Sequence, residues 1–85
     1  MFIGNVQFNE CHVLEVGKLY LVYHRNIRKG TGGEYFCGLY NGLSYSHEFI
    51  HCRVYTNYTA GALKRTDLVK SVVYVSDEFI LRKSD

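Results

Sequence analysis

The pattern of apolar and polar residues along this chain is that of short β-strands. The clearest example is the stretch 17–24, which is rich in β-branched and aromatic residues. Its large apolar side chains fall on both faces, with Leu21 on one and Val22 on the other. A strand of this kind is expected in a barrel wall, or in a sheet that is covered on both sides.

Five to seven short strands are predicted in all, over residues 2–8, 11–16, 17–24, 34–40, 49–56, 68–75 and 78–82. Residues 25–33 are basic and glycine-rich and are predicted to form a loop, and residues 60–67 have a short helical or 3₁₀ character. Gly38 interrupts a strand, which predicts a bulge or a tight bend. Asn41 and Gly42 tolerate positive φ, so they predict the turn of a hairpin.

These elements predict a mostly β fold with at most one short helical turn. A small antiparallel barrel or roll is the expected architecture, because closing the sheet hides the edges of many short strands. An SH3-like barrel is the first choice and an OB-like barrel the second. Residues 1–85 contain neither a repeat nor a linker, and they are predicted to form one domain.

The composition supports a folded domain with a modest core, since 47% of the 85 residues are hydrophobic. No apolar stretch approaches the length of about 20 residues that a membrane span needs. The first residues lack the features of a signal peptide, so the protein is expected to be intracellular, in the cytoplasm. In that compartment the three cysteines are expected to be reduced and mostly buried.

The segment 47–51 (HEFIH) matches the H-E-x-x-H pattern of zinc proteases. That pattern binds zinc only on a helix, where residues four apart share a face. The flanking sequence favours a strand, on which His47 and His51 would lie about 13 Å apart, too far to bind one metal. A zinc site at HEFIH is therefore only a remote alternative. A second, weaker alternative is a metal site that joins the adjacent pairs Cys11-His12 and His51-Cys52. The spacing of these pairs is not that of a structural zinc site. No metal and no cofactor is predicted.

No constellation of catalytic residues is predicted. Cys37 and Cys52 stand among apolar residues, where burial makes a thiol unreactive. The glycines at 30–33 follow Lys29 and precede a strand, whereas a phosphate-binding loop needs the lysine after the glycines and a helix next. The chain is therefore predicted to be a binding module and not an enzyme.

The first functional hypothesis is that the domain binds a protein partner through a tyrosine-rich surface. Tyrosine offers a large contact area at low entropic cost, and arginine is a frequent anchor of interfaces. The candidate residues lie near predicted strand ends and turns: Tyr40, Tyr45, Arg53, Tyr55 and Tyr58. A small phage or mobile-element protein that inhibits or redirects a host factor would have this character. Pairing of two copies through a free edge strand is a further alternative.

The alternative hypothesis is that the domain binds nucleic acid. Basic residues in the predicted loop lie next to aromatic ones, and a second group of basic residues lies near residue 65. Small barrels bind nucleic acid by stacking bases on aromatic rings while basic groups neutralise phosphates. The net charge of +2 leaves this question open. The candidate residues are Arg25, Arg28, Lys29, Lys64 and Arg65.

Overall fold

The computed structural model describes residues 2–3, 5–24, 34–57, 63–76 and 79–84. Most of them belong to strands, and no helix occurs within these ranges. The strands are β1 (Phe2–Ile3), β2 (Val6–Glu10), β3 (Leu19–His24), β4 (Glu34–Leu43), β5 (His47–Asn57), β6 (Leu63–Val75) and β7 (Phe79–Ser84). The prediction of a mostly β fold is confirmed.

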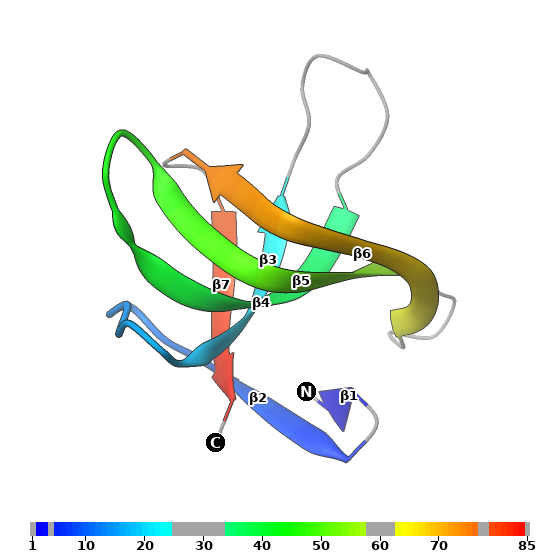
Figure 1. Cartoon of the computed structure of the whole chain (residues 1–85). Helices are drawn as coiled ribbons and strands as arrows, with labels where there is room; N and C mark the ends of the chain where they lie inside the picture. The colour runs from blue at the N-terminus through cyan, green and yellow to red at the C-terminus, as the bar shows by residue number, and fades with distance from the viewer. Residues whose placement is uncertain (1, 4, 25–33, 58–62, 77–78, 85) are drawn as a thin grey trace.

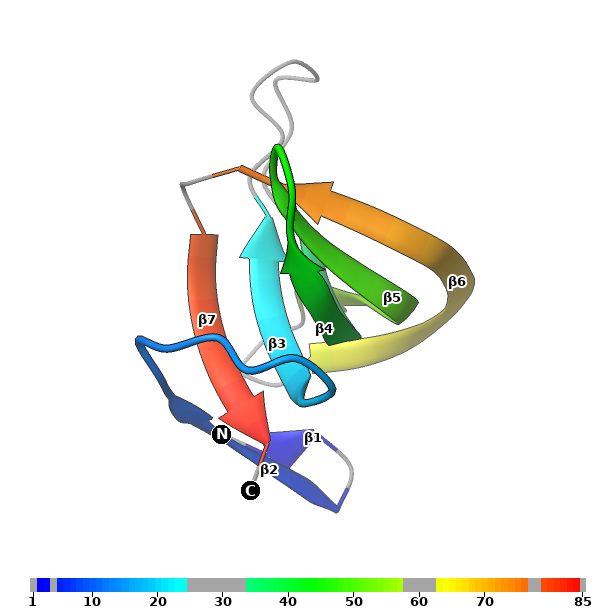
Figure 2. The same cartoon turned by 60° about the vertical axis from the view of Figure 1, so that its left-hand side comes forward.

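The strands form one seven-stranded sheet in the order β1-β2-β7-β3-β4-β5-β6, and every pair is antiparallel. Strands β3 to β6 follow one another as a meander, whereas β7 lies between β2 and β3 (Figure 1). The sheet curls into a half-barrel with β6 at one end of the curl (Figure 2). This agrees with a small barrel or roll, and the choice between an SH3-like and an OB-like arrangement stays a prediction.

The ladder between β4 and β5 is irregular at Gly38. The register of β4 against β5 shifts between Cys37 and Leu39, which confirms the predicted irregularity. A Cβ atom at Gly38 would lie 2.6 Å from the Sγ atom of Cys52, so the two strands approach too closely there for any side chain. On β5, His51 adopts a φ of 53°, a left-handed conformation that accompanies the bulge.

The inner face of the curl holds the main core. Aromatic rings pack edge-on there, as Tyr20 does against Tyr40 and Phe49. Cys11, Leu14 and Leu81 are partly buried against this cluster. Its buried members come from β3, β4, β5 and β6: Tyr20, Val22, Phe36, Tyr40, Phe49, Cys52, Val54, Val73 and Val75.

A second, smaller core lies on the outer face of the same sheet. Phe8, Leu21 and Cys37 are buried there, because the β1–β2 hairpin supplies a cover for this side. The partly buried residues around them are Ile3, Leu19, Tyr35, Tyr55 and Leu63. Strand β3 therefore sends apolar side chains into both cores, as the pattern of residues 17–24 predicted.

The prediction of a strand at 11–16 is wrong. Residues 11–16 cross in front of β7 and β3 instead (Figure 2), and we call them the crossing segment. They pack Leu14 against the inner core. The Tyr20 hydroxyl accepts a hydrogen bond from the Glu15 backbone nitrogen at 2.6 Å and lies 3.4 Å from the Val13 carbonyl oxygen. These bonds to a buried side chain replace the ladder that a strand would need.

The structure differs from two local predictions, one of a helical turn and one of a hairpin turn. Residues 63–67 are strand and not helix, because they pair with the end of β5, where the Thr66 hydroxyl donates to the Val54 carbonyl at 2.6 Å. The predicted helical residues 60–62 lie outside the described ranges. Asn41 and Gly42 belong to β4, and the β4–β5 turn lies at residues 44–46. Gly42 does adopt a positive φ of 117°, but beside a second register shift.

Candidate functional site

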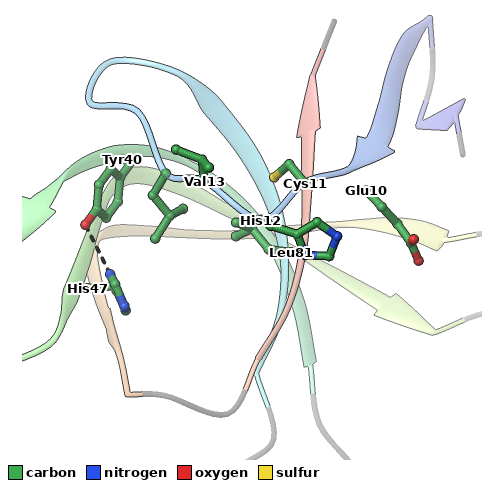
Figure 3. A pocket seen from close by; sticks show the side chains of 8 residues that line it. Glu10, Cys11, His12, Val13, Tyr40, His47 and Leu81 are labelled. Carbon is green, nitrogen blue, oxygen red and sulfur yellow. Dashed lines mark hydrogen bonds between the residues drawn. The ribbon is translucent and has the colours of Figure 1, made fainter.

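A hollow of about 650 Å³ opens beside the inner core, between the crossing segment and the β4–β5 hairpin (Figure 3). Its size lies within the range of ligand pockets, which is about 300–1,000 Å³. Apolar and polar side chains share its wall, and they come from elements far apart in the sequence. The lining residues are Glu10, Cys11, His12, Val13, Leu14, Tyr40, His47 and Leu81.

Tyr40 and His47 form one side of this hollow. The ring of Tyr40 is 6% exposed and packs against Phe49 with 5.4 Å between ring centroids. Its hydroxyl lies 3.1 Å from Nδ1 of His47, at the start of β5 (Figure 3). Burial raises the pKa of Tyr40, so the phenol stays protonated at neutral pH. The ring thus belongs to the core, and its polar end reaches the hollow.

The thiols do not supply a nucleophile. Desolvation raises the pKa of Cys11, the cysteine that lines the hollow. Burial raises the pKa of Cys37 to about 12 and that of Cys52 to about 11. A thiol of this kind stays protonated at neutral pH, and a protonated thiol is a poor nucleophile.

Exposed apolar side chains surround the end of the β4–β5 hairpin. Tyr45, at the turn, is fully exposed, and it lines a smaller hollow of about 280 Å³ together with Tyr74 of β6. Leu43 is 65% exposed and is the ladder partner of His47. Val13, which lines the large hollow together with His47, is 71% exposed. We call Val13, Leu43, Tyr45 and Tyr74 the hairpin surface.

The structure divides the predicted partner-binding residues into two groups. Tyr40 and Tyr45 lie at the hairpin end, although Tyr40 contributes only its hydroxyl edge. Arg53 and Tyr55 lie in the distal half of β5, where both are half-buried and Arg53 donates from Nη1 to the Thr66 carbonyl oxygen at 3.2 Å. Tyr58 lies outside the described residues. Arg53 thus has a structural bond that the sequence did not indicate.

The structure describes two of the five predicted basic residues. Arg25, Arg28 and Lys29 lie outside the described residues, whereas Lys64 and Arg65 are exposed on β6. Strand β6 ends the sheet order, so its outer edge has no ladder partner among the described strands. Pairing of two copies through this edge stays a prediction.

The HEFIH segment lies on strand β5, as its sequence context predicted. The two histidines differ in setting: His47 contacts Tyr40, while His51 is exposed at the bulge. Across the part of the chain that the structure describes, no group of three His, Cys, Asp or Glu side chains could hold a metal ion. The helix that the zinc-protease pattern requires does not form here.

Val13, Leu43 and Tyr74 were missed as candidate binding residues. Apolar residues occupy four successive positions at 72–75, so the pattern could not show which of them face solvent. In the structure Val73 and Val75 are buried, and Val72 and Tyr74 are exposed. Val13 was missed because the segment around it was expected to pair as a strand.

Within the described ranges, no helix has the length and apolar character needed to cross a membrane. Comparisons with protein-family models, with curated proteins and with solved structures found no match to this chain.

Proposed function

We propose that this domain is a non-enzymatic module that binds a protein partner through the hairpin surface. The observation that carries the proposal is the gathering of exposed apolar side chains beside two hollows at one end of the β4–β5 hairpin. Single exposed apolar residues are common on protein surfaces, whereas a cluster next to a hollow is typical of an interaction site.

The chemistry of the hairpin surface suits a protein partner. Tyr45 and Tyr74 combine a large apolar ring with a polar hydroxyl, a combination enriched in protein interfaces. Beside them, Glu48 accepts a hydrogen bond from Nδ2 of Asn41 at 2.8 Å, which gives the apolar surface a polar rim. A central apolar contact enclosed by polar groups is the arrangement in which a few residues provide most of the binding energy.

The larger hollow favours an inserted side chain. Val13, Leu14 and Leu81 provide apolar contacts, and His12 and His47 provide hydrogen-bonding groups. An apolar or aromatic side chain of the partner would enter this space and contact the hairpin surface at its rim. A module of this size acts by occupying its partner's surface, as an inhibitor encoded by a phage or mobile element does.

The test is comparative capture followed by measurement with the purified partner. A tagged wild-type protein and its Tyr45→Ala and Val13→Asp variants are used to capture partners from cell extracts. A protein captured by the wild type is then purified, and its Kd is measured by calorimetry. We expect each substitution to weaken binding about 30-fold, which corresponds to about 2 kcal/mol for a central interface residue.

The matched control is Phe2→Ala, which removes an aromatic ring that is 67% exposed on the β1–β2 hairpin. This variant should bind the partner like the wild type. Tyr45→Ala should change the free energy of unfolding by less than about 0.5 kcal/mol, because the side chain is fully exposed. A partner whose affinity is the same for wild type, Tyr45→Ala and Val13→Asp would contradict the proposed surface.

A further inference from the structure

A row of three tyrosines crosses the outer face of the sheet. Tyr23 on β3 is the direct ladder partner of Tyr35 on β4, and Tyr35 is the partner of Tyr55 on β5. Arg65 on β6 is the ladder partner of Tyr55 and continues the row. Direct partners in an antiparallel ladder place their side chains on the same face, so these four residues follow one line across four strands.

The tyrosine row is accessible as well as ordered. Tyr23, Tyr35 and Tyr55 are each partly exposed, and the rings of Tyr23 and Tyr35 contact each other with 4.8 Å between centroids. The inner sides of Tyr35 and Tyr55 pack against the outer core. That packing fixes the rings in place, so ligand binding there would cost little side-chain entropy.

Positive charge lies at the Tyr55 end of the row. Burial raises the pKa of the Tyr55 phenol, while the guanidinium groups of Arg65 and Arg53 act on it in the opposite direction, as nearby positive charges do. Arg65 is exposed, and Arg53 is half-buried and bonded to the Thr66 carbonyl. Arginine is suited to phosphate because its planar guanidinium can form two parallel hydrogen bonds.

A hollow of about 430 Å³ adjoins the same end of the row. Tyr55 and Arg65 line it together with Asn5 of the turn between β1 and β2. An amide side chain both donates and accepts hydrogen bonds, as the edge of a nucleobase does. The remaining wall is apolar and consists of Ile3, Val6 and Leu63.

We propose that this face binds single-stranded nucleic acid, with bases stacked along Tyr23, Tyr35 and Tyr55 and a phosphate held by Arg65. Aromatic rings beside positive charges are the general means by which proteins bind unpaired strands. A duplex fits less well, because its bases are already stacked on one another. The tyrosine row is separate from the hairpin surface, so this inference goes beyond the proposed function.

The first experiment measures fluorescence anisotropy with labelled oligonucleotides of about twelve nucleotides, within the site sizes of about 4–16 known for small barrels. Oligo(dT), oligo(U) and a DNA duplex are compared at several salt concentrations. The single strands should bind more tightly than the duplex, and a preference for dT or U identifies the polymer as DNA or RNA. Absence of binding to both single strands at low salt, or tighter binding of the duplex, would overturn the inference.

Charge variants locate the phosphate contact. Arg65→Gln should make the negative slope of log K against log salt shallower by about 0.7, the contribution of one phosphate contact on a single strand. Lys18→Gln is the matched control, since it removes the same charge from an exposed residue. Lys18 directly precedes β3, at the end of that strand away from Tyr23. Equal changes of slope in the two variants would show non-specific charge attraction and would overturn the assignment to the row.

Ring variants locate the stacking. Tyr55→Leu should weaken binding about five- to hundredfold, as expected from the loss of one stacked base, whereas Tyr55→Phe retains the ring and should bind like the wild type. Circular dichroism tests whether both variants are folded. If Tyr55→Leu does not fold, Tyr35→Phe and Tyr35→Leu serve as a second pair. Equal binding by the Leu and Phe variants of a folded pair would overturn stacking. Tyr45→Ala, on the hairpin surface, should leave oligonucleotide binding unchanged.

Discussion

The properties of single residues depend here on what lies across the sheet from them. Gly38 was recognisable from the sequence as an interruption of a strand, but its role is to let β4 and β5 approach each other at the Sγ atom of Cys52. Cys52 in turn donates a hydrogen bond to the Phe49 carbonyl at 3.2 Å, so its sulfur is held in place. A small residue and a small thiol therefore share one crowded position in the core.

Gly38→Ala should lower the free energy of unfolding by about 1–3 kcal/mol, the usual cost of overpacking a core. The cause is the added Cβ atom, which would meet the Cys52 sulfur at 2.6 Å and the Phe49 Cβ atom at 3.1 Å. Urea denaturation of the two single variants and of Gly38→Ala/Cys52→Ala tests this. The double variant should be more stable than the sum of the single effects predicts, and strict additivity would exclude the sulfur as the source of the clash.

The buried thiols predict a loss of stability at alkaline pH. In the folded state the pKa of Cys37 is raised to about 12 and that of Cys52 to about 11, from an ordinary value of 9.0. The unfolded state therefore releases these protons at lower pH. The stabilising contribution is complete below about pH 9 and is lost as the pH rises towards the folded pKa values. Cys37→Ala should lose less stability than the wild type between about pH 9 and 11, as measured by urea denaturation at each pH.

At the scale of elements, the two cores explain how a single curled sheet becomes a stable domain. The inner core is closed by the crossing segment, which a hydrogen bond from Glu15 to Tyr20 and an ion pair between Glu15 and Lys83 hold against β3 and β7. The outer core is closed by the β1–β2 hairpin, whose only fully buried side chain in the described part is Phe8. Short covering elements thus bury part of each face of the central strands.

Phe8→Ala should destabilise the protein by about 3–5 kcal/mol, because Phe8 is 1% exposed and packs against Leu21 and Cys37. Such a loss is a large fraction of the stability of a domain of this size. Phe2→Ala, in the same hairpin but with an exposed ring, should change stability by less than about 0.5 kcal/mol. Thermal and urea denaturation measure both, and similar losses would mean that the hairpin is held by something other than Phe8.

At the scale of the whole molecule, β7 joins the two ends of the sequence. It pairs with β2 on one side and with β3 on the other, so residues 79–84 connect the N-terminal strands to the meander. Without β7 the strand β3 would have a free edge, and β2 would have no partner except β1. The domain is closed by contacts between residues that are far apart in sequence.

Removal of residues 77–85 should therefore abolish cooperative folding. The truncated chain would lose two ladders at once and would expose the β3 edge, which favours aggregation. Removal of residues 1–4 should be tolerated far better, because β1 pairs only with β2. Circular dichroism and size-exclusion chromatography of the two truncated proteins decide the matter, and a cooperative unfolding transition in the first would contradict this account of β7.

The sequence by itself determined the β class, the positions of the central strands, the irregularity at Gly38 and the absence of a helix at HEFIH. These features follow from local alternation, β-branched composition and backbone freedom, which act over a few residues. For the same reason the two-faced pattern of residues 17–24 predicted either a barrel wall or a strand covered on both sides, and the inner and outer cores show cover on both sides of β3.

Only the tertiary structure decided which apolar residues are exposed on the surface. Val72 and Tyr74 face solvent while Val73 and Val75 are buried, because pairing with β5 fixes the orientation of β6. Residues 11–16 became a cover and residues 63–67 a strand, because bonds to Tyr20 and to β5 outweigh weak local preferences. The hairpin surface and the tyrosine row join residues from several strands, and strand register, which depends on long-range packing, is what brings them together.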